Sequence, residues 1–179
     1  MLNSRQILDQ KIITGPIDDD MVAQVGVDLR VIEIKSIYGG GVVPQQGKTK
    51  LAHKEPVKRN GGREVGLENA VWLLQPGAYD VTFEQGCDIP ADKVMLLRQR
   101  SSLLRNGSIL HSSVFDPGFS TKNVGTVLIV ISPIVIEFKA RIAQAYIHEC
   151  TEVASEDLYD GQFQGDKQRD QSKNVKDAK

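Results

Sequence analysis

From residue 71 to residue 149 the chain is a succession of short apolar runs, and turn-forming residues separate one run from the next. Asn106-Gly107, Pro117-Gly118 and Ser132-Pro133 are pairs that favour turns. Short runs that recur every roughly 8 to 12 residues are typical of a β-sandwich, jelly roll or barrel. We therefore expect an all-β fold with almost no helix. The expected strands lie within residues 71–74, 79–85, 88–100, 108–116, 124–132 and 134–149.

The N-terminal region predicts one helix and one further strand. Residues 4–13 form an amphipathic pattern in which Ile7, Leu8 and Ile12 recur at helical spacing, and Ser4 is a suitable cap. Residues 25–34 then alternate between apolar and polar side chains, as in a strand with one wet face.

Residues 39–66 are rich in glycine and polar residues, which predicts a long hairpin or a mobile insertion outside the core. Residues 166–179 are highly charged and contain no aromatic residue, which predicts a disordered tail. The expected organisation is therefore one domain over residues 1–165, followed by that tail.

The overall composition limits the possible partners and compartments. Charged residues make up 25% of the chain and nearly cancel, leaving a formal net charge of −1, which argues against a nucleic-acid-coating protein. Cys87 and Cys150 lack the spacing of a metal motif. No apolar segment reaches the length of a membrane helix, and the N-terminus lacks the apolar region of a signal peptide. We expect a cytoplasmic protein that binds neither nucleic acid nor membranes.

Four short stretches carry most of the chemical information: GVDLR at residues 26–30, RSSL at 100–103, FDPGF at 115–119 and RIAQ at 141–144. Arginine and serine packed into one stretch suggest an anion, and phosphate is the usual one. Taken singly, each stretch also has a structural explanation, such as ordinary Asp-Pro-Gly turn chemistry. Their occurrence together and in this order is harder to explain structurally.

The order of these motifs resembles the trimeric dUTPase and dCTP deaminase superfamily, and the chain is most similar to its deaminase-like, archaeal-type dUTPases. The resemblance covers about residues 1–165 and includes the late segment YDGQFQG at residues 159–165. It implies a distorted β jelly roll of the β-clip kind with a short N-terminal helix. It also implies a homotrimer with active sites between subunits, in which one chain's tail closes over another chain's site.

The resemblance assigns roles to individual residues. Asp116 would activate the attacking water as the catalytic carboxylate, and Phe119 would stack under the deoxyribose. The triphosphate would arrive with Mg²⁺, which Asp28 would touch through water unless Asp28 is purely structural. The remaining candidates are Arg100, Ser101, Ser102, Arg105 and Gln144 for phosphate, His111, Ser112 and Ser113 for the base, and Tyr159, Gln162, Phe163 and Gln164 for the lid.

Two activities occur in this superfamily, and one residue distinguishes them. The deaminases use a glutamate on the strand after the third motif to carry a proton, whereas residues 126–132 contain no carboxylate here. Ile129 or a neighbour takes that position, and Glu137 lies one strand too late. We therefore predict a dUTP diphosphatase, with a dCTP deaminase or a bifunctional enzyme as the alternative. A regulatory trimer that binds partners through residues 39–66 is a third, non-enzymatic hypothesis.

Overall fold

The computed structural model describes residues 1–165, so the predicted disordered tail at 166–179 lies outside the described residues. The described chain is mostly β. Its elements are α1 (Ser4–Asp9), β1 (Ile13–Thr14), η1 (Asp19–Met21), β2 (Val27–Tyr38), β3 (His53–Pro56), η2 (Gly62–Val65), β4 (Val71–Leu74), β5 (Gly77–Phe83), β6 (Gly86–Asp88), β7 (Lys93–Gln99), α2 (Ser101–Arg105), β8 (Ser108–Leu110), β9 (Val114–Phe115), β10 (Ser120–Thr121), β11 (Gly125–Val130), β12 (Ile134–Glu137), β13 (Arg141–Glu149) and η3 (Ser155–Asp157).

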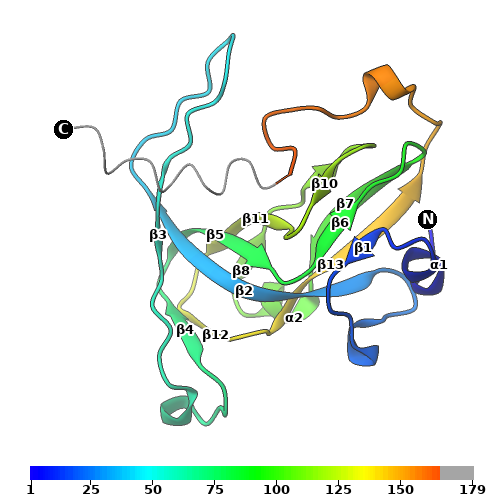
Figure 1. The fold of residues 1–179 in the computed structure, drawn as a ribbon. Coiled ribbons are helices and arrows are strands. Elements are labelled where there is room, and N and C mark those ends of the chain that lie inside the picture. Colours follow the sequence, from blue (N-terminus) through cyan, green and yellow to red (C-terminus); the bar gives the residue numbers. More distant parts are fainter. Residues whose placement is uncertain (166–179) are drawn as a thin grey trace.

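One curled antiparallel sheet forms the body of the molecule (Figure 1). Its strand order is β8-β11-β5-β2-β13-β7-β9, and β3 also pairs with β2. The 12-residue β2 holds this sheet together, because its first residues pair with β13 and its later residues pair with β5. A three-stranded sheet, β1-β6-β10, and the ribbon β4-β12 complete the fold. The predicted all-β architecture with a short N-terminal helix is confirmed.

The segment at residues 111–113 joins the two ends of the curled sheet. It leaves β8, which pairs with β11, and enters β9, which pairs with β7. The His111 amide donates a hydrogen bond to the Val127 carbonyl of β11 (2.8 Å), and the Leu97 amide of β7 donates to the Ser113 carbonyl (3.0 Å). The backbone of this short connection is therefore anchored on both sides.

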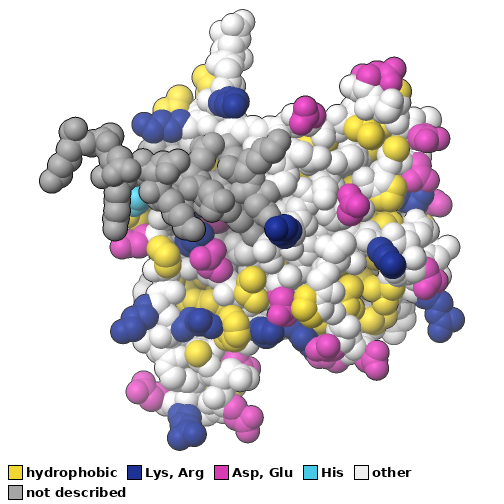
Figure 2. Space-filling view, in the orientation of Figure 1, with side chains coloured by type: hydrophobic (Ala, Val, Ile, Leu, Met, Phe, Trp, Pro, Cys, Tyr) yellow, Lys and Arg dark blue, Asp and Glu magenta, His cyan; other side chains and the backbone are white. Residues whose placement is uncertain are grey.

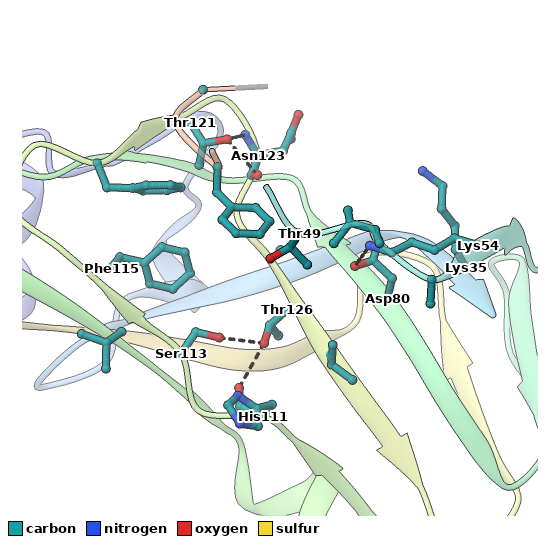
Figure 3. A pocket seen from close by; sticks show the side chains of 18 of the residues that line it. Lys35, Thr49, Lys54, Asp80, His111, Ser113, Phe115, Thr121, Asn123 and Thr126 are labelled. Atoms are coloured by element: carbon teal, nitrogen blue, oxygen red, sulfur yellow. Dashed lines mark hydrogen bonds and ion pairs between the residues drawn. The ribbon is translucent and has the colours of Figure 1, made fainter. Parts of the chain in front are cut away.

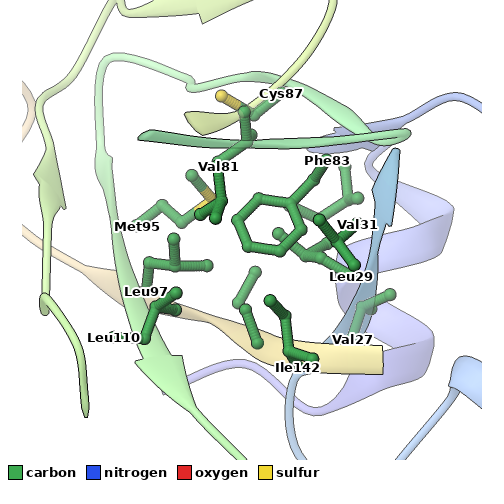
Figure 4. Packing of buried hydrophobic residues seen from close by; sticks show 14 of the residues in the cluster. Val27, Leu29, Val31, Val81, Phe83, Cys87, Met95, Leu97, Leu110 and Ile142 are labelled. Atoms are coloured by element: carbon green, nitrogen blue, oxygen red, sulfur yellow. The ribbon is translucent and has the colours of Figure 1, made fainter. Parts of the chain in front are cut away.

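The core lies inside the curl of the sheet, where alternate side chains of the strands meet (Figure 4). Leu29 of β2, Phe83 of β5 and Leu97 of β7 are completely buried there. The period-two burial along β7 and β11 follows from the strand pleat, which sends successive side chains to opposite faces. Burying these apolar side chains supplies the main driving force for folding.

The N-terminal helix is capped one residue earlier than expected, because it begins at Ser4, the predicted cap. Asn3 is the N-cap residue, because its side chain accepts a hydrogen bond from the Gln6 amide while the Gln6 side chain accepts one from the Asn3 amide. The predicted cap, Ser4, is instead buried in the first turn. Its hydroxyl donates to the carbonyl of Gly26 at 2.8 Å. Ser4 thus ties α1 to the start of β2 instead of capping the helix.

The first part of residues 39–66 forms a hairpin. We call residues 39–56 the hairpin arm. Its strand β3 pairs with the end of β2, and Val42 and Lys50 form a bridge farther out. Figure 1 shows this arm rising from the body, with the β4-β12 ribbon at the opposite end. After the arm, Val57 packs against the core, and its carbonyl accepts a hydrogen bond from the Trp72 indole (3.2 Å).

The surface carries both signs of charge. On the face drawn in Figure 2, basic and acidic side chains are intermixed with hydrophobic groups between them. No helix among residues 1–165 has the length and apolar character needed to span a membrane. Both cysteines are free thiols; Cys87 is buried and Cys150 is exposed.

Candidate active site

A cavity of about 930 Å³ opens where the joining segment at residues 111–113 meets the third motif, β11, the hairpin arm and the end of the described chain. Figure 3 shows His111, Ser113 and Phe115 on one side of it, and Thr49 with the Lys54–Asp80 pair on another. Six of the predicted site residues line this cavity: His111, Ser113, Asp116, Phe119, Tyr159 and Phe163.

The third motif forms a tight turn that presents Asp116 and Phe119 to the cavity. The Phe119 amide donates to the Asp116 carbonyl at 3.0 Å, which closes the turn. Pro117 suits the second position of such a turn, and Gly118 adopts φ +85°, which a type II turn requires at its third position. A β-carbon on Gly118 would also lie 2.8 Å from the Leu158 β-carbon. The Asp116 side chain is exposed and lines the cavity.

Phe119 sits in a row of three aromatic rings. Its centroid lies 5.3 Å from that of Phe115 and 5.4 Å from that of Tyr159, with tilted and edge-on geometries. Such contacts are favourable and hold the ring in one orientation. Phe119 is only 9% exposed, so what it offers to the cavity is a limited, fixed apolar surface.

The segment at residues 159–165 packs against the third motif and the hairpin arm of its own chain. The Gln162 amide group exchanges two hydrogen bonds with the Thr49 backbone (3.1 and 3.0 Å). Gln164 donates to the Gly118 carbonyl at 2.8 Å and accepts from the Ser120 amide at 3.1 Å. Tyr159, Phe163 and Gly165 of this segment line the cavity of their own chain, and the implied closure over a neighbouring chain's site stays a prediction.

The phosphate candidates lie elsewhere: among the described residues that line the cavity, none belongs to that group. The RSSL motif, expected at the end of a strand, starts a five-residue helix, α2, with Arg100 as its N-cap residue. Ser101, Ser102 and Arg105 are exposed. Gln144 is on β13, where its amide donates to the Val25 carbonyl (3.3 Å) and accepts from the Tyr146 hydroxyl. Ser112, the third base candidate, is also not among the lining residues.

Asp28 connects the first, second and fourth motifs. Its carboxylate lies 3.2 Å from the Arg100 guanidinium and 3.7 Å from that of Arg141, and only 7% of the side chain is exposed. Burial raises the pKa of the Asp28 carboxyl, while the two guanidinium groups oppose that rise. Gly26, two residues before Asp28, has φ +81°, and a β-carbon there would lie 2.7 Å from the Ala145 carbonyl. This glycine therefore permits the close approach of β2 to β13.

The cavity is also lined by residues that lie outside the four motifs. Thr126, a buried hydroxyl residue of β11, contacts both Ser113 and the His111 carbonyl. Lys54 and Asp80 form an ion pair at 2.9 Å. The sequence feature that could have indicated Thr126 is its position as a hydroxyl residue at the start of the aliphatic run 126–131. The Lys54–Asp80 pair has no local signal, because its members come from different strands.

The described strand β11 carries no carboxylate, and Glu137 lies outside the cavity. Glu137 ends β12, where its carboxylate accepts hydrogen bonds from the backbone and side-chain amides of Asn69 (3.2 and 2.9 Å). Within residues 1–165 no group of three or more His, Cys, Asp and Glu side chains is arranged to hold a metal ion.

Comparison with known proteins identifies the family. The family model described as dCTP deaminase-like matches residues 3–150. The chain belongs to the dCTP deaminase-like family. One curated relative is a deoxyuridine 5′-triphosphate nucleotidohydrolase from Methanocaldococcus jannaschii, which is 32% identical over 83% of this chain and 90% of its own. Another is a probable deoxyuridine 5′-triphosphate nucleotidohydrolase from Aeropyrum pernix, which is 31% identical over 92% of this chain and 98% of its own.

A solved structure supports the fold. The 2′-deoxycytidine 5′-triphosphate deaminase from Agrobacterium tumefaciens superposes with a TM-score of 0.60 at 16% identity, over 82% of this chain. The match spans 47% of that deaminase chain, about half of its length. The predicted family and the predicted distorted jelly-roll fold are thereby confirmed.

Proposed function

We propose that this protein is a dUTP diphosphatase, which hydrolyses dUTP to dUMP and pyrophosphate. The relatives cited above carry the name deoxyuridine 5′-triphosphate nucleotidohydrolase and align with most of the chain. The observation that carries the choice of reaction is the content of the cavity. It holds an exposed carboxylate, Asp116, and no glutamate from β11 that could shuttle a proton during deamination.

The proposed roles follow from the positions of the side chains. The uracil would lie against residues 111–113, and the deoxyribose would lie on Phe119, leaving no space for a 2′-hydroxyl. Asp116 would accept a proton from the water that attacks the α-phosphorus, and pyrophosphate would leave. Residues 159–165 would cover the bound nucleotide, with Tyr159 and Phe163 at the cavity.

The triphosphate groups would be held by Arg100, Ser101, Ser102, Arg105 and Gln144 of a neighbouring copy in a homotrimer. This division is supported by the absence of all five from the described lining of the chain's own cavity. Guanidinium groups bind phosphate oxygens through two hydrogen bonds at once, and serine hydroxyls add donors. Because Asp28 contacts Arg100 at 3.2 Å, we assign Asp28 to holding that guanidinium in place.

Mg²⁺ would enter with the triphosphate, whose oxygens supply most of the ligands. It would neutralise charge on the phosphates. Water could relay a contact from Asp28, although the two guanidinium groups already occupy that carboxylate. The substrate is thus a small molecule, and we place the reaction in the cytoplasm, with neither nucleic acid nor membrane as a partner.

The test is to incubate the protein with dUTP, dCTP, dTTP and UTP in parallel, with Mg²⁺, while monitoring pyrophosphate and ammonia. We expect pyrophosphate from dUTP alone. Ammonia released from dCTP would instead establish the alternative, a dCTP deaminase or bifunctional enzyme. The structural neighbour is named as a dCTP deaminase. Turnover of UTP at the rate of dUTP would contradict the role of Phe119.

A further inference from the structure

The cavity wall contains a chain of hydrogen bonds that starts at Ser113. The Ser113 and Thr126 hydroxyl oxygens lie 2.9 Å apart, and the Thr126 hydroxyl donates to the His111 carbonyl at 3.1 Å. Figure 3 shows both contacts as a continuous path along the wall. Thr126 is 8% exposed and Ser113 is half-buried, so bulk water does not readily replace these bonds.

The direction of this chain follows from its last member. A carbonyl oxygen can only accept, so the single hydroxyl hydrogen of Thr126 is used on His111. In the contact between the two hydroxyls, Thr126 must then be the acceptor and Ser113 the donor. With its own hydrogen committed, the Ser113 oxygen can offer only lone pairs to a molecule in the cavity.

We propose that Ser113, oriented by Thr126, selects uracil over cytosine by accepting a hydrogen bond from the N3–H group of the base. This inference rests on the proposed function and names the residue that sets its base specificity. Uracil carries a hydrogen on N3, whereas the N3 of cytosine carries a lone pair. A cytosine in the same position would set two acceptors against each other.

Reversing the chain to accommodate cytosine has a cost. For Ser113 to donate to the base, it must give up its bond to Thr126, which is buried beside it. Sites that leave buried polar groups without partners reject the wrong ligand strongly. Thr126 is therefore a positioning residue: it does not touch the base but determines which way the Ser113 hydroxyl points.

The test measures binding of two nonhydrolysable nucleotides, the α,β-imido analogues of dUTP and dCTP, by isothermal titration calorimetry. Ser113→Ala should weaken binding of the dUTP analogue about tenfold, but it should not weaken binding of the dCTP analogue, because it also removes the acceptor that opposes N3 of cytosine. Thr126→Val keeps the shape but removes the acceptor, so Ser113 becomes free to donate. The dCTP analogue should then bind about tenfold more tightly than to wild type.

Thr126→Ser retains the hydroxyl and should retain the wild-type preference, so it tests orientation even if the valine variant is unstable. Ser36→Ala, which removes a hydroxyl bonded to the Glu55 carbonyl outside the cavity, is the matched control. Equal weakening of both analogues in Ser113→Ala, or an unchanged preference in Thr126→Val, would overturn the inference. Failure of wild type to release pyrophosphate from dUTP would instead refute the proposed function, because analogue binding is read independently of turnover.

Discussion

At the scale of single residues, Asp116 combines exposure with a fixed backbone. Its carbonyl accepts from the Phe119 amide, which holds the turn, while its carboxylate faces the cavity without burial. A carboxylate held at this position can act as a general base toward a water molecule in the cavity. Asp28, in contrast, is buried between the Arg100 and Arg141 guanidinium groups and holds the first, second and fourth motifs together.

Asp116→Asn should lower the rate of pyrophosphate release from dUTP by about 10²- to 10⁴-fold, because an amide cannot take the proton of the attacking water. Binding of the nonhydrolysable dUTP analogue and the Tm should stay close to wild type, since the side chain is exposed. The exposed Asp9→Asn on α1 serves as the control. Retained turnover in the Asp116 variant would remove this residue from the catalytic role.

The two cysteines should differ in reactivity. Burial raises the pKa of the Cys87 thiol to about 12, whereas Cys150 is exposed. Because the thiolate is the reactive form, a disulfide reagent at pH 8 should label one thiol in the native protein and two after denaturation. The thiol pKa of Cys87 is higher in the folded state than in the unfolded chain, so the unfolded chain loses this proton at a lower pH. The free energy of unfolding should therefore fall as pH rises above about 8.5. Rapid labelling of both thiols in native protein would contradict this.

At the scale of elements, the hairpin arm and the segment at residues 159–165 form one cover over the cavity. Gln162 links the segment to the arm at Thr49, and Gln164 links it to the third motif at Gly118. Each glutamine bonds backbone groups through both ends of its amide, so the cover is held by paired contacts. The arm thereby has a structural part in the site whether or not it binds partners.

Gln162→Ala should raise the KM for dUTP about three- to tenfold and leave kcat within twofold, because each neutral hydrogen bond contributes about 0.5–1.5 kcal/mol and the chemistry lies elsewhere. Gln164→Ala should act similarly. Gln45→Ala, an exposed glutamine of the arm outside the cavity lining, provides the comparison. An unchanged KM in both cover variants would show that this segment does not close on substrate.

The longer strands were largely predictable from the chain, since the turn pairs and short apolar runs indicate β4, β5, β7, β11 and β13. The two-residue strand β10 lies in none of the expected runs, and β12 and β13 were expected within one run. The prediction from sequence was wrong at positions where two local structures are both favourable. Asn3 and Ser4 are both good helix caps, and the reciprocal bonds with Gln6 favour Asn3. The RSSL motif forms a helix because Leu103 buries its side chain one turn after Arg100, a choice that depends on the core beneath it.

At the scale of the whole molecule, the candidate site is divided. The cavity with Asp116 and Phe119 is separate from the exposed hydroxyls of α2 that are expected to bind phosphate. A single copy within the described residues thus places the two halves apart. Rotational symmetry in a closed oligomer would bring one half of each copy to the other half of the next.

Mixing two inactive variants tests this division. A double variant, Ser101→Ala with Ser102→Ala, lacks phosphate donors, and Asp116→Asn lacks the catalytic carboxylate. Refolded together in equal amounts, they should recover about a quarter of wild-type dUTP hydrolysis, because a quarter of randomly assembled shared sites receive two intact halves. Sites built within one chain would stay inactive in the mixture. Sedimentation of the wild type as a trimer is the accompanying measurement.

The sequence by itself determined the fold class, the family and the identity of the motif residues, because strand periodicity, turn chemistry and motif order are local properties of the chain. Only the tertiary structure decided which of these residues share a cavity, that Asp28 is buried against Arg100 and Arg141, and that Thr126 orients Ser113. Those contacts join residues far apart in the sequence. They depend on strand register and on the curl of the sheet, which the packing of the whole core sets.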